Sequence, residues 1–338
     1  MREQIVAVIG GGVVGLTTAL ALQAPDRRIH LIERDAAPAR RSSWAGGGIV
    51  CPLRPWREPD ALWPLIDRSR ALYPVLAAQL QRETGIDIEY RLTGIEWQVD
   101  GKEREQAMAW LSARGLPVET PEDRLRCPEL GQVRNPRLGR ALAMAFQRRG
   151  GTMHCGHAAR PWIEGQRARG IQFDGGVTLT TDAVVVAAGA WSGDLLDGPA
   201  PEIFPVKGQM LLKRVAGADT RPVIVGQEVY LIPRADGHLL IGSTVEHVGF
   251  DTSVTEAARR WLLDAADRLA PWQSDAPVLR QWAGLRPGAH SSVPVIGHGG
   301  ASGLWLNLGH YRNGIALAPA CAEDLCQRMG YQSSLSPP

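Results

Sequence analysis

Apolar runs and glycines follow one another in a regular order at the start of the chain. Residues 5–9 (IVAVI) are apolar and mostly β-branched, which predicts a short strand buried on both faces. Residues 10–15 carry turn glycines, and residues 14–23 are almost wholly apolar, which predicts a helix buried against a sheet. Residues 29–32 predict a second strand, which ends at Glu33. The pattern therefore predicts a βαβ unit at the N-terminus.

The same segment is also long enough to span a bilayer, because residues 5–24 contain no charged side chain. Four glycines interrupt this run, and Arg2 is offset by Glu3, which differs from the basic start of a signal peptide. We therefore expect a strand, a turn and a helix here and no membrane anchor.

Helical and strand patterns continue along the rest of the chain. Apolar residues recur at helical spacing over residues 61–81, 135–150, 256–269 and 315–329. Ser253 and Glu256 have the spacing of a capping box, which predicts that the third of these helices begins there. Residues 206–242 are rich in β-branched residues and turn glycines, which predicts antiparallel strands.

The glycine spacing in the first turn indicates a nucleotide site. In G-x-G-x-x-G, Gly10 permits the tight turn, Gly12 lets the backbone approach a pyrophosphate, and Gly15 lets helix and strand pack closely. Glu33 follows at the end of the second strand, where a carboxylate accepts hydrogen bonds from ribose hydroxyls and disfavours a 2′-phosphate. The alternative is that these glycines serve packing alone.

Two further segments favour FAD over NAD, whose ADP half is the same. Residues 41–48 (RSSWAGGG) form a second glycine-rich loop, whose hydroxyls and N–H groups suit a ribityl chain and a flavin edge. Residues 184–188 predict a strand that runs into the small-residue turn at Gly189, where backbone can pass close to a cofactor. Each segment alone could also be an ordinary turn between a strand and a helix.

Composition narrows the possible partners. The 338 residues exceed what one core usually supports, so we expect two domains, possibly interleaved. The 37 Lys and Arg against 35 Asp and Glu give a net charge of +2, which provides no reason to expect nucleic acid or an anionic membrane as partner.

Five scattered cysteines without a CxxC pair favour a reducing, cytoplasmic setting. His154 and His157 have no further ligand cluster nearby, so we expect no metal site.

With these motifs the chain resembles the D-amino-acid-oxidase family of FAD-dependent oxidoreductases, and within it the glycine oxidases linked to thiamine synthesis. The resemblance covers nearly the whole chain. It is carried by VIGGGVVGL (8–16), SSWAGGGIV (42–50), VVVAAGAWSG (184–193), PVKGQ (205–209), AGLRP (283–287) and GHYRNGIALAPA (309–320).

The resemblance implies an α/β fold, α+β overall, in which a Rossmann-like FAD-binding domain is built from separated segments and an antiparallel-sheet substrate domain is inserted between them. We assign residues 1–82, 135–205 and 283–330 to the FAD-binding domain and residues 83–134 and 206–282 to the substrate domain. Residues 331–338 are expected to form a disordered tail.

The resemblance also implies oxidative deamination of a small amino acid. Hydride leaves Cα for the flavin, an imine forms, and oxygen reoxidises the flavin to give hydrogen peroxide. The expected substrate is glycine, with sarcosine and small D-amino acids as further candidates, and the imine would supply thiazole formation. Three alternatives stay open: a D-amino-acid dehydrogenase that passes electrons to a quinone, the flavin domain of a tRNA-modifying enzyme, and a flavin-binding module without turnover. A homo-oligomer is compatible with all of them.

Motif positions then imply the site residues. Tyr230, Arg286 and Arg312 correspond to the family's carboxylate-binding trio, and the planar fork of arginine suits a carboxylate. No acid–base residue is expected at carbon. The implied FAD contacts are Gly10, Gly12, Val13, Val14, Gly15, Glu33, Arg34, Ser42, Ser43, Gly47, Gly48, Ile49, Ala159, Gly189, His310, Tyr311, Arg312, Asn313, Gly314, Ile315 and Ala316.

Two details refine this picture. Relatives that attach FAD covalently do so through a cysteine after the AGLRP-like arginine, and residues 287–297 contain none, so we expect non-covalent FAD. The final helix should begin near Asn313 and Gly314, with its positive end directed at the N1–C2=O edge of the flavin.

Overall fold

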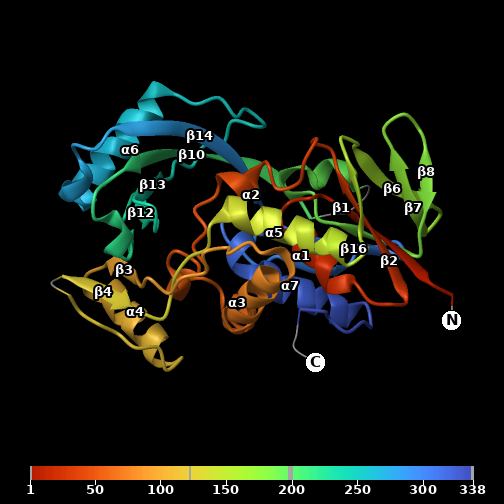
Figure 1. The fold of residues 1–338 in the computed structure, drawn as a ribbon, viewed down its shortest axis with the longest axis horizontal. Coiled ribbons are helices and arrows are strands. Elements are labelled where there is room, and N and C mark those ends of the chain that lie inside the picture. Colours follow the sequence, from red (N-terminus) through yellow and green to blue (C-terminus); the bar gives the residue numbers. More distant parts are fainter. Residues whose placement is uncertain (1, 122, 197–200, 336–338) are drawn as a thin grey trace.

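Two large sheets organise the chain, one toward each end of the molecule (Figure 1). The computed structural model describes residues 2–121, 123–196 and 201–335. The mixed α/β fold expected from the sequence is confirmed, because one sheet is mainly parallel and the other mainly antiparallel.

The first sheet contains the N-terminal βαβ unit. Strands β1 (Gln4–Ile9) and β2 (Arg27–Glu33) pair in parallel and are joined by α1 (Val13–Leu22). The sheet order is β15-β16-β9-β1-β2-β5, and β15 is antiparallel to β16 while the other pairs are parallel. The remaining strands come from distant parts of the chain: β5 (Thr152–Cys155), β9 (Ala183–Val186), β15 (Val295–His298) and β16 (Leu304–Leu308).

Both faces of this sheet are covered, which explains why residues 5–9 are apolar throughout. Val6 and Val8 lie in a core with four helices that pack on one another: α1, α3 (Trp63–Thr84), α5 (Asn135–Arg148) and α7 (Gly314–Arg328). Ala7 and Ile9 point the other way, into a core with a small sheet of β6 (Ala159–Glu164), β7 (Arg167–Phe173) and β8 (Thr178–Thr180). Successive side chains of a strand alternate in direction, so such a strand has no polar face.

The second sheet is long and mostly antiparallel, in the order β14-β10-β13-β12-β11-β3-β4, with β11 and β3 parallel. Helix α6 (Glu256–Leu269) covers one face, and α4 (Gly101–Ser112) packs in the core of the other face (Figure 1). The strands are β3 (Ile95–Gln98), β4 (Arg124–Cys127), β10 (Phe204–Arg214), β11 (Val223–Val225), β12 (Tyr230–Pro233), β13 (His238–Gly242) and β14 (Val278–Gly288).

Short helices connect these elements. One α-helical turn, α2 (Ser42–Ala45), lies in the second glycine-rich loop. The 3-10 helices are η1 (Pro55–Arg57), η2 (Asp60–Leu62), η3 (Gly189–Trp191), η4 (Gly193–Leu195), η5 (Ala218–Thr220) and η6 (Pro271–Gln273).

The uncharged N-terminal segment folds as β1 and α1, as its glycines predict. Across residues 2–121, 123–196 and 201–335, no helix has both the length and the apolar character needed to cross a membrane.

The predicted capping box is wrong. Helix α6 begins at Glu256 and its cap is Thr255, whose hydroxyl accepts a hydrogen bond from the N–H of Ala258 (3.2 Å). Ser253 donates instead to the Asp251 carboxylate through its amide and its hydroxyl (both 2.9 Å). A serine already bonded to a side chain outside the helix is not available as a cap.

The prediction of a disordered tail from residue 331 is wrong for residues 331–335. Leu335 is 1% exposed in the helical core, and the Ser334 amide donates to the carbonyl of Ala21 (3.0 Å). Residues 336–338 lie outside the described part of the chain. The division into domains remains a prediction, and its boundary at residue 283 falls inside β14, which pairs with β10 along almost its whole length.

Candidate functional site

A cavity of about 370 Å³ lies where the carboxyl ends of the parallel strands meet the second sheet. Gly10 follows β1, Glu33 ends β2, and Gly309 follows β16. The opposite wall comes from β10, β12 and β14, through Met210, Tyr230 and Arg286 among others. Ligands of open parallel sheets bind at the carboxyl ends of the strands, so the position of this cavity makes it the candidate site.

The glycine turn is shaped partly by packing and partly by the cavity. Gly10 has φ +112°, and a Cβ there would overlap the carbonyl of Ala187. A Cβ on Gly15 would overlap the carbonyl oxygen of Gly10, which agrees with the predicted close approach of helix and strand. Gly12 is different, because a Cβ there would meet only the Ser43 hydroxyl, at 3.2 Å, and this residue lines the cavity.

Glu33 lines the cavity beside this turn and is held by backbone. Its two carboxylate oxygens accept hydrogen bonds from the N–H groups of Gly11 and Asp35 (both 2.9 Å). Burial raises the pKa of Glu33 above its ordinary value, although these two hydrogen bonds act to lower it. The carboxylate is thus fixed at the end of β2, in the position that the motif predicts for a ribose contact.

Cationic and aromatic side chains cluster close to Glu33. The Arg34 guanidinium lies over the Trp191 ring (3.6 Å to the centroid), and Phe250 stacks with Trp191 (5.4 Å between centroids). Arg41 forms a two-point ion pair with Asp35 (2.6 Å). Arg34, Arg41 and Trp191 all line the cavity, so this end offers positive charge and an aromatic face together.

The second glycine-rich loop is held by residues of helix α5 and of the turn after strand β12. The Asn135 amide donates to the carbonyl of Gly46 (2.6 Å), and the Arg234 guanidinium donates to that of Gly47 (2.8 Å). A Cβ on Gly47 would meet Ile232 at 2.5 Å, and one on Gly48 would overlap Asn135. The glycines in this loop are therefore required by close packing, and the loop lines the cavity as predicted.

The GHYRNG motif places an unbonded polar atom in the cavity wall. His310 is 2% exposed, and its Nε2 has no hydrogen-bond partner among the described residues. Burial lowers the pKa of His310 to about 4, so its imidazole is neutral near pH 7. Asn313 precedes α7, and Gly314, its first residue, lines the cavity. A neutral donor or acceptor and the positive end of a 15-residue helix therefore border the same space.

Tyr230, Arg286 and Arg312 border the cavity together, as the resemblance implies. Burial lowers the pKa of Arg286, nearby Tyr230 opposes this, and nearby Arg312 lowers it further. No carboxylate of the described residues pairs with Arg286 or Arg312. Two close guanidinium groups without a counter-ion are suited to binding an anion.

Small residues make room for this trio. A Cβ on Gly208 would overlap the Arg286 guanidinium, and a Cβ on Gly242 would meet the Tyr230 ring at 2.7 Å. The glycine of the PVKGQ motif is therefore explained by the arginine of AGLRP, because β10 and β14 are paired strands.

Nearly all the predicted cofactor and substrate residues line the cavity. Gly15 and Ala316 do not: Gly15 packs on the glycine turn, and Ala316 is buried in a cluster with α3. The roles of the lining residues remain predictions. Sequence reasoning did not single out several other lining residues, among them Cys51, Leu53, Trp191, Met210 and Ser243. Strand alternation from Gly208 could have identified Met210, whereas Ser243 lies beyond the end of β13 and gives no local signal.

Comparisons with known proteins agree with this geometry. The family model described as FAD dependent oxidoreductase matches residues 6–328. The chain is 40% identical to a glycine oxidase of Pseudomonas aeruginosa, over 100% of this chain and 98% of that protein. It is 33% identical to the bifunctional protein ThiO/ThiG of Trichormus variabilis, over 94% of this chain and 51% of that protein. The crystal structure of a glycine oxidase from Bacillus cereus superposes with a TM-score of 0.88 at 27% identity, covering 97% of this chain and 95% of that one.

Proposed function

Because the chain belongs to the family of FAD-dependent oxidoreductases, we propose that it is a glycine oxidase that binds FAD non-covalently. The proposed reaction converts glycine, water and oxygen into glyoxylate, ammonia and hydrogen peroxide. The observation that carries the proposal is the pair Arg286 and Arg312, which border the cavity without a carboxylate partner in the described chain. Full-length similarity to glycine oxidases supports the choice of substrate.

The cavity lining fits FAD. Gly12 leaves the glycine turn open toward the cavity, and Glu33 presents a fixed carboxylate to a ribose. Arg34 lines the cavity and would add positive charge that favours an anionic cofactor, while the charge of Arg41 is paired with Asp35. The unbonded Nε2 of His310 is a buried polar atom that a polar cofactor atom would satisfy.

The chain's own residues position the substrate. FAD, when bound, supplies the two-electron acceptor for the hydride that leaves Cα. Arg286 and Arg312 would hold the glycine carboxylate and Tyr230 would add a hydroxyl donor, which together would fix the orientation of the amine and Cα within the cavity. The positive end of α7 borders the cavity and would favour negative charge on a cofactor bound there. No side-chain base is needed at carbon, because a neutral amine already carries the electron pair that forms the imine.

The product and the setting follow from the same proposal. Relatives that join ThiO and ThiG in one chain support a role for the imine in thiazole formation for thiamine. All five cysteines are unpaired, which suits a reducing, cytoplasmic compartment.

Non-covalent FAD gives a first prediction. Purified protein should be yellow, and acid precipitation should leave FAD in the supernatant, because residues 287–297 lack the cysteine of covalent relatives. Flavin absorbance of supernatant and pellet measures this directly. Flavin that stays in the washed pellet would show a covalent link.

Replacing Glu33 with alanine should weaken FAD binding by about 1.5–3 kcal/mol, or about tenfold to a hundredfold in Kd. The change removes charge-assisted hydrogen bonds to ribose, while enzyme saturated with FAD should turn over at a nearly normal rate. Titration of the apoprotein with FAD, followed by flavin fluorescence, gives the Kd. Glu3→Ala is the matched control. It removes a carboxylate that forms an exposed ion pair with Arg28, a residue of β2 like Glu33. Unchanged FAD affinity in Glu33→Ala would show that Glu33 only holds the N–H groups of Gly11 and Asp35 and does not bind the cofactor.

A panel of amines tests the substrate assignment. Peroxide release should be fastest with glycine, weaker with sarcosine and small D-amino acids, and absent with ethylamine, which lacks the carboxylate. Preference for a large D-amino acid over glycine would contradict the proposal.

A further inference from the structure

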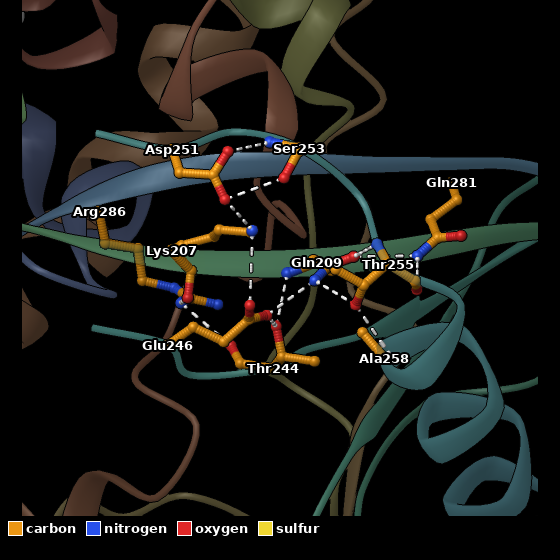
Figure 2. A network of polar contacts seen from close by, with 10 residues as sticks. All are labelled: Lys207, Gln209, Thr244, Glu246, Asp251, Ser253, Thr255, Ala258, Gln281 and Arg286. Carbon is orange, nitrogen blue, oxygen red and sulfur yellow. Dashed lines mark hydrogen bonds and ion pairs between the residues drawn. The ribbon is translucent and has the colours of Figure 1, made fainter. Parts of the chain in front are cut away.

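Lys207 on β10 is a buried cation with two carboxylate partners. Its side chain is 2% exposed, and Nζ lies 2.9 Å from Asp251 and 3.5 Å from Glu246 (Figure 2). Both carboxylates belong to residues 243–255, the segment between β13 and α6. Lys207 therefore ties this segment to β10 through charge.

The backbone of Lys207 makes the same connection. Its N–H donates to the carbonyl of Glu246 (2.9 Å), and its carbonyl accepts from the N–H of Glu246 (3.0 Å). The segment thus lies alongside β10. The Lys207 side chain lies between the carboxylates of Glu246 and Asp251 and contacts both (Figure 2).

Arg286 is held by this assembly. Its Nη1 donates to the carbonyls of Lys207 (3.3 Å) and Thr244 (3.2 Å), and its Nη2 donates to the hydroxyl of Ser243 (2.6 Å). Every one of these acceptors belongs either to Lys207 or to the segment that Lys207 holds. Figure 2 shows Arg286 beside Lys207 and Thr244. A guanidinium has five N–H groups, so these three bonds fix the direction of the other two, and the Tyr230 hydroxyl lies beside the same guanidinium.

A second set of bonds braces the segment. The Glu246 carboxylate also accepts from the Thr244 hydroxyl and from the Gln209 amide (2.9 Å). The Gln209 carbonyl oxygen in turn accepts from the N–H of Thr255, the cap of α6 (2.9 Å). Thr244 is therefore connected to β10 through Glu246. Its carbonyl, which accepts from Arg286, belongs to a residue held by several hydrogen bonds.

We propose that Lys207, through its ion pairs with Asp251 and Glu246, is a positioning residue that aims the other two N–H groups of Arg286 at the substrate carboxylate. The inference rests on the proposed function, since it assigns the carboxylate to Arg286. An ion pair with a half-exposed partner such as Asp251 contributes little net stability in general, which favours orientation as its role. Lys207 itself touches neither cofactor nor substrate in this scheme.

The exposed partner offers the cleanest test. Lys207→Met would leave two carboxylates unpaired and could prevent folding, whereas Asp251 is 47% exposed. Asp251→Asn should raise the Kd of glycolate about threefold to tenfold, by analogy with other coupled networks. Glycolate binding is read from the absorption change of the bound flavin. KM for glycine should rise by the same factor, with kcat within about twofold and the thermal unfolding temperature within about 2 °C of the parent. Asp324→Asn, which breaks an exposed pair with Arg328 on α7, should change none of these.

A double variant separates this inference from the proposed function. In an Arg286→Lys background, Asp251→Asn should no longer affect glycolate binding, because the group that it positions is gone. An equal effect of Asp251→Asn in both backgrounds, or no effect in either, would overturn the positioning role. If Arg286→Lys alone left glycolate binding unchanged, the proposed carboxylate site would be wrong, and the inference would fall with it.

Discussion

Arg312→Ala is expected to lower kcat/KM for glycine at least about tenfold and as much as about a thousandfold. Loss of hydrogen bonds to a charged carboxylate costs about 1.5–3 kcal/mol, and a misplaced Cα adds to this because hydride transfer requires close approach to the flavin. Arg312 is exposed toward the cavity and has no ion pair within the described chain, so its charge is free for a ligand. Arg312→Lys should also be impaired, since it keeps the charge but loses the planar fork.

Three controls distinguish this loss from general damage. FAD content should be nearly preserved in Arg312→Ala, and glycolate affinity should fall in step with kcat/KM. Arg328→Ala, on the exposed face of α7, should behave like the parent. Near-normal glycine turnover together with normal glycolate binding in Arg312→Ala would contradict the assignment of this site.

Alanine at Gly15 should destabilise the protein by about 3 kcal/mol or more, among the larger effects of single substitutions. The added Cβ would overlap the carbonyl oxygen of Gly10, which is backbone and cannot rotate away, so α1 would have to move off β1. We expect poor folding and no FAD binding. Thermal unfolding of the apoprotein measures the first effect, and flavin titration measures the second.

Alanine at Gly12 is the informative comparison. Its Cβ would meet only the Ser43 hydroxyl, at 3.2 Å, so the apoprotein should unfold at nearly the parent temperature. The methyl group would project into the cavity, where backbone is expected to approach the pyrophosphate, and FAD affinity should fall at least about tenfold. Equal FAD affinity in Gly12→Ala and the parent would place the pyrophosphate elsewhere.

The sequence predicted the local parts of the site well, because these depend on short-range patterns. The strand, turn and helix over residues 4–22 and the position of Glu33 follow from residue types within one βαβ unit. Tyr230 and Arg286 also border the expected cavity, although those positions came from motif resemblance and not from any local rule.

The remaining features depend on contacts between distant segments. Nothing near Arg286 in the sequence indicates that its guanidinium binds Ser243 and Thr244, because that contact needs the pairing of β10 with both β13 and β14. The failed capping box has the same origin. Lys207 on β10 holds Asp251, and the Asp251 carboxylate accepts hydrogen bonds from Ser253, so Thr255 caps α6 instead.

Anaerobic mixing of the purified protein with glycine tests the central claim most directly. The account predicts that glycine bleaches the visible absorption of the bound flavin, and that admitted oxygen restores it with one peroxide and one glyoxylate formed per glycine consumed. A flavin spectrum that stays oxidised at saturating glycine, while another amine or a quinone-coupled substrate bleaches it, would contradict the account.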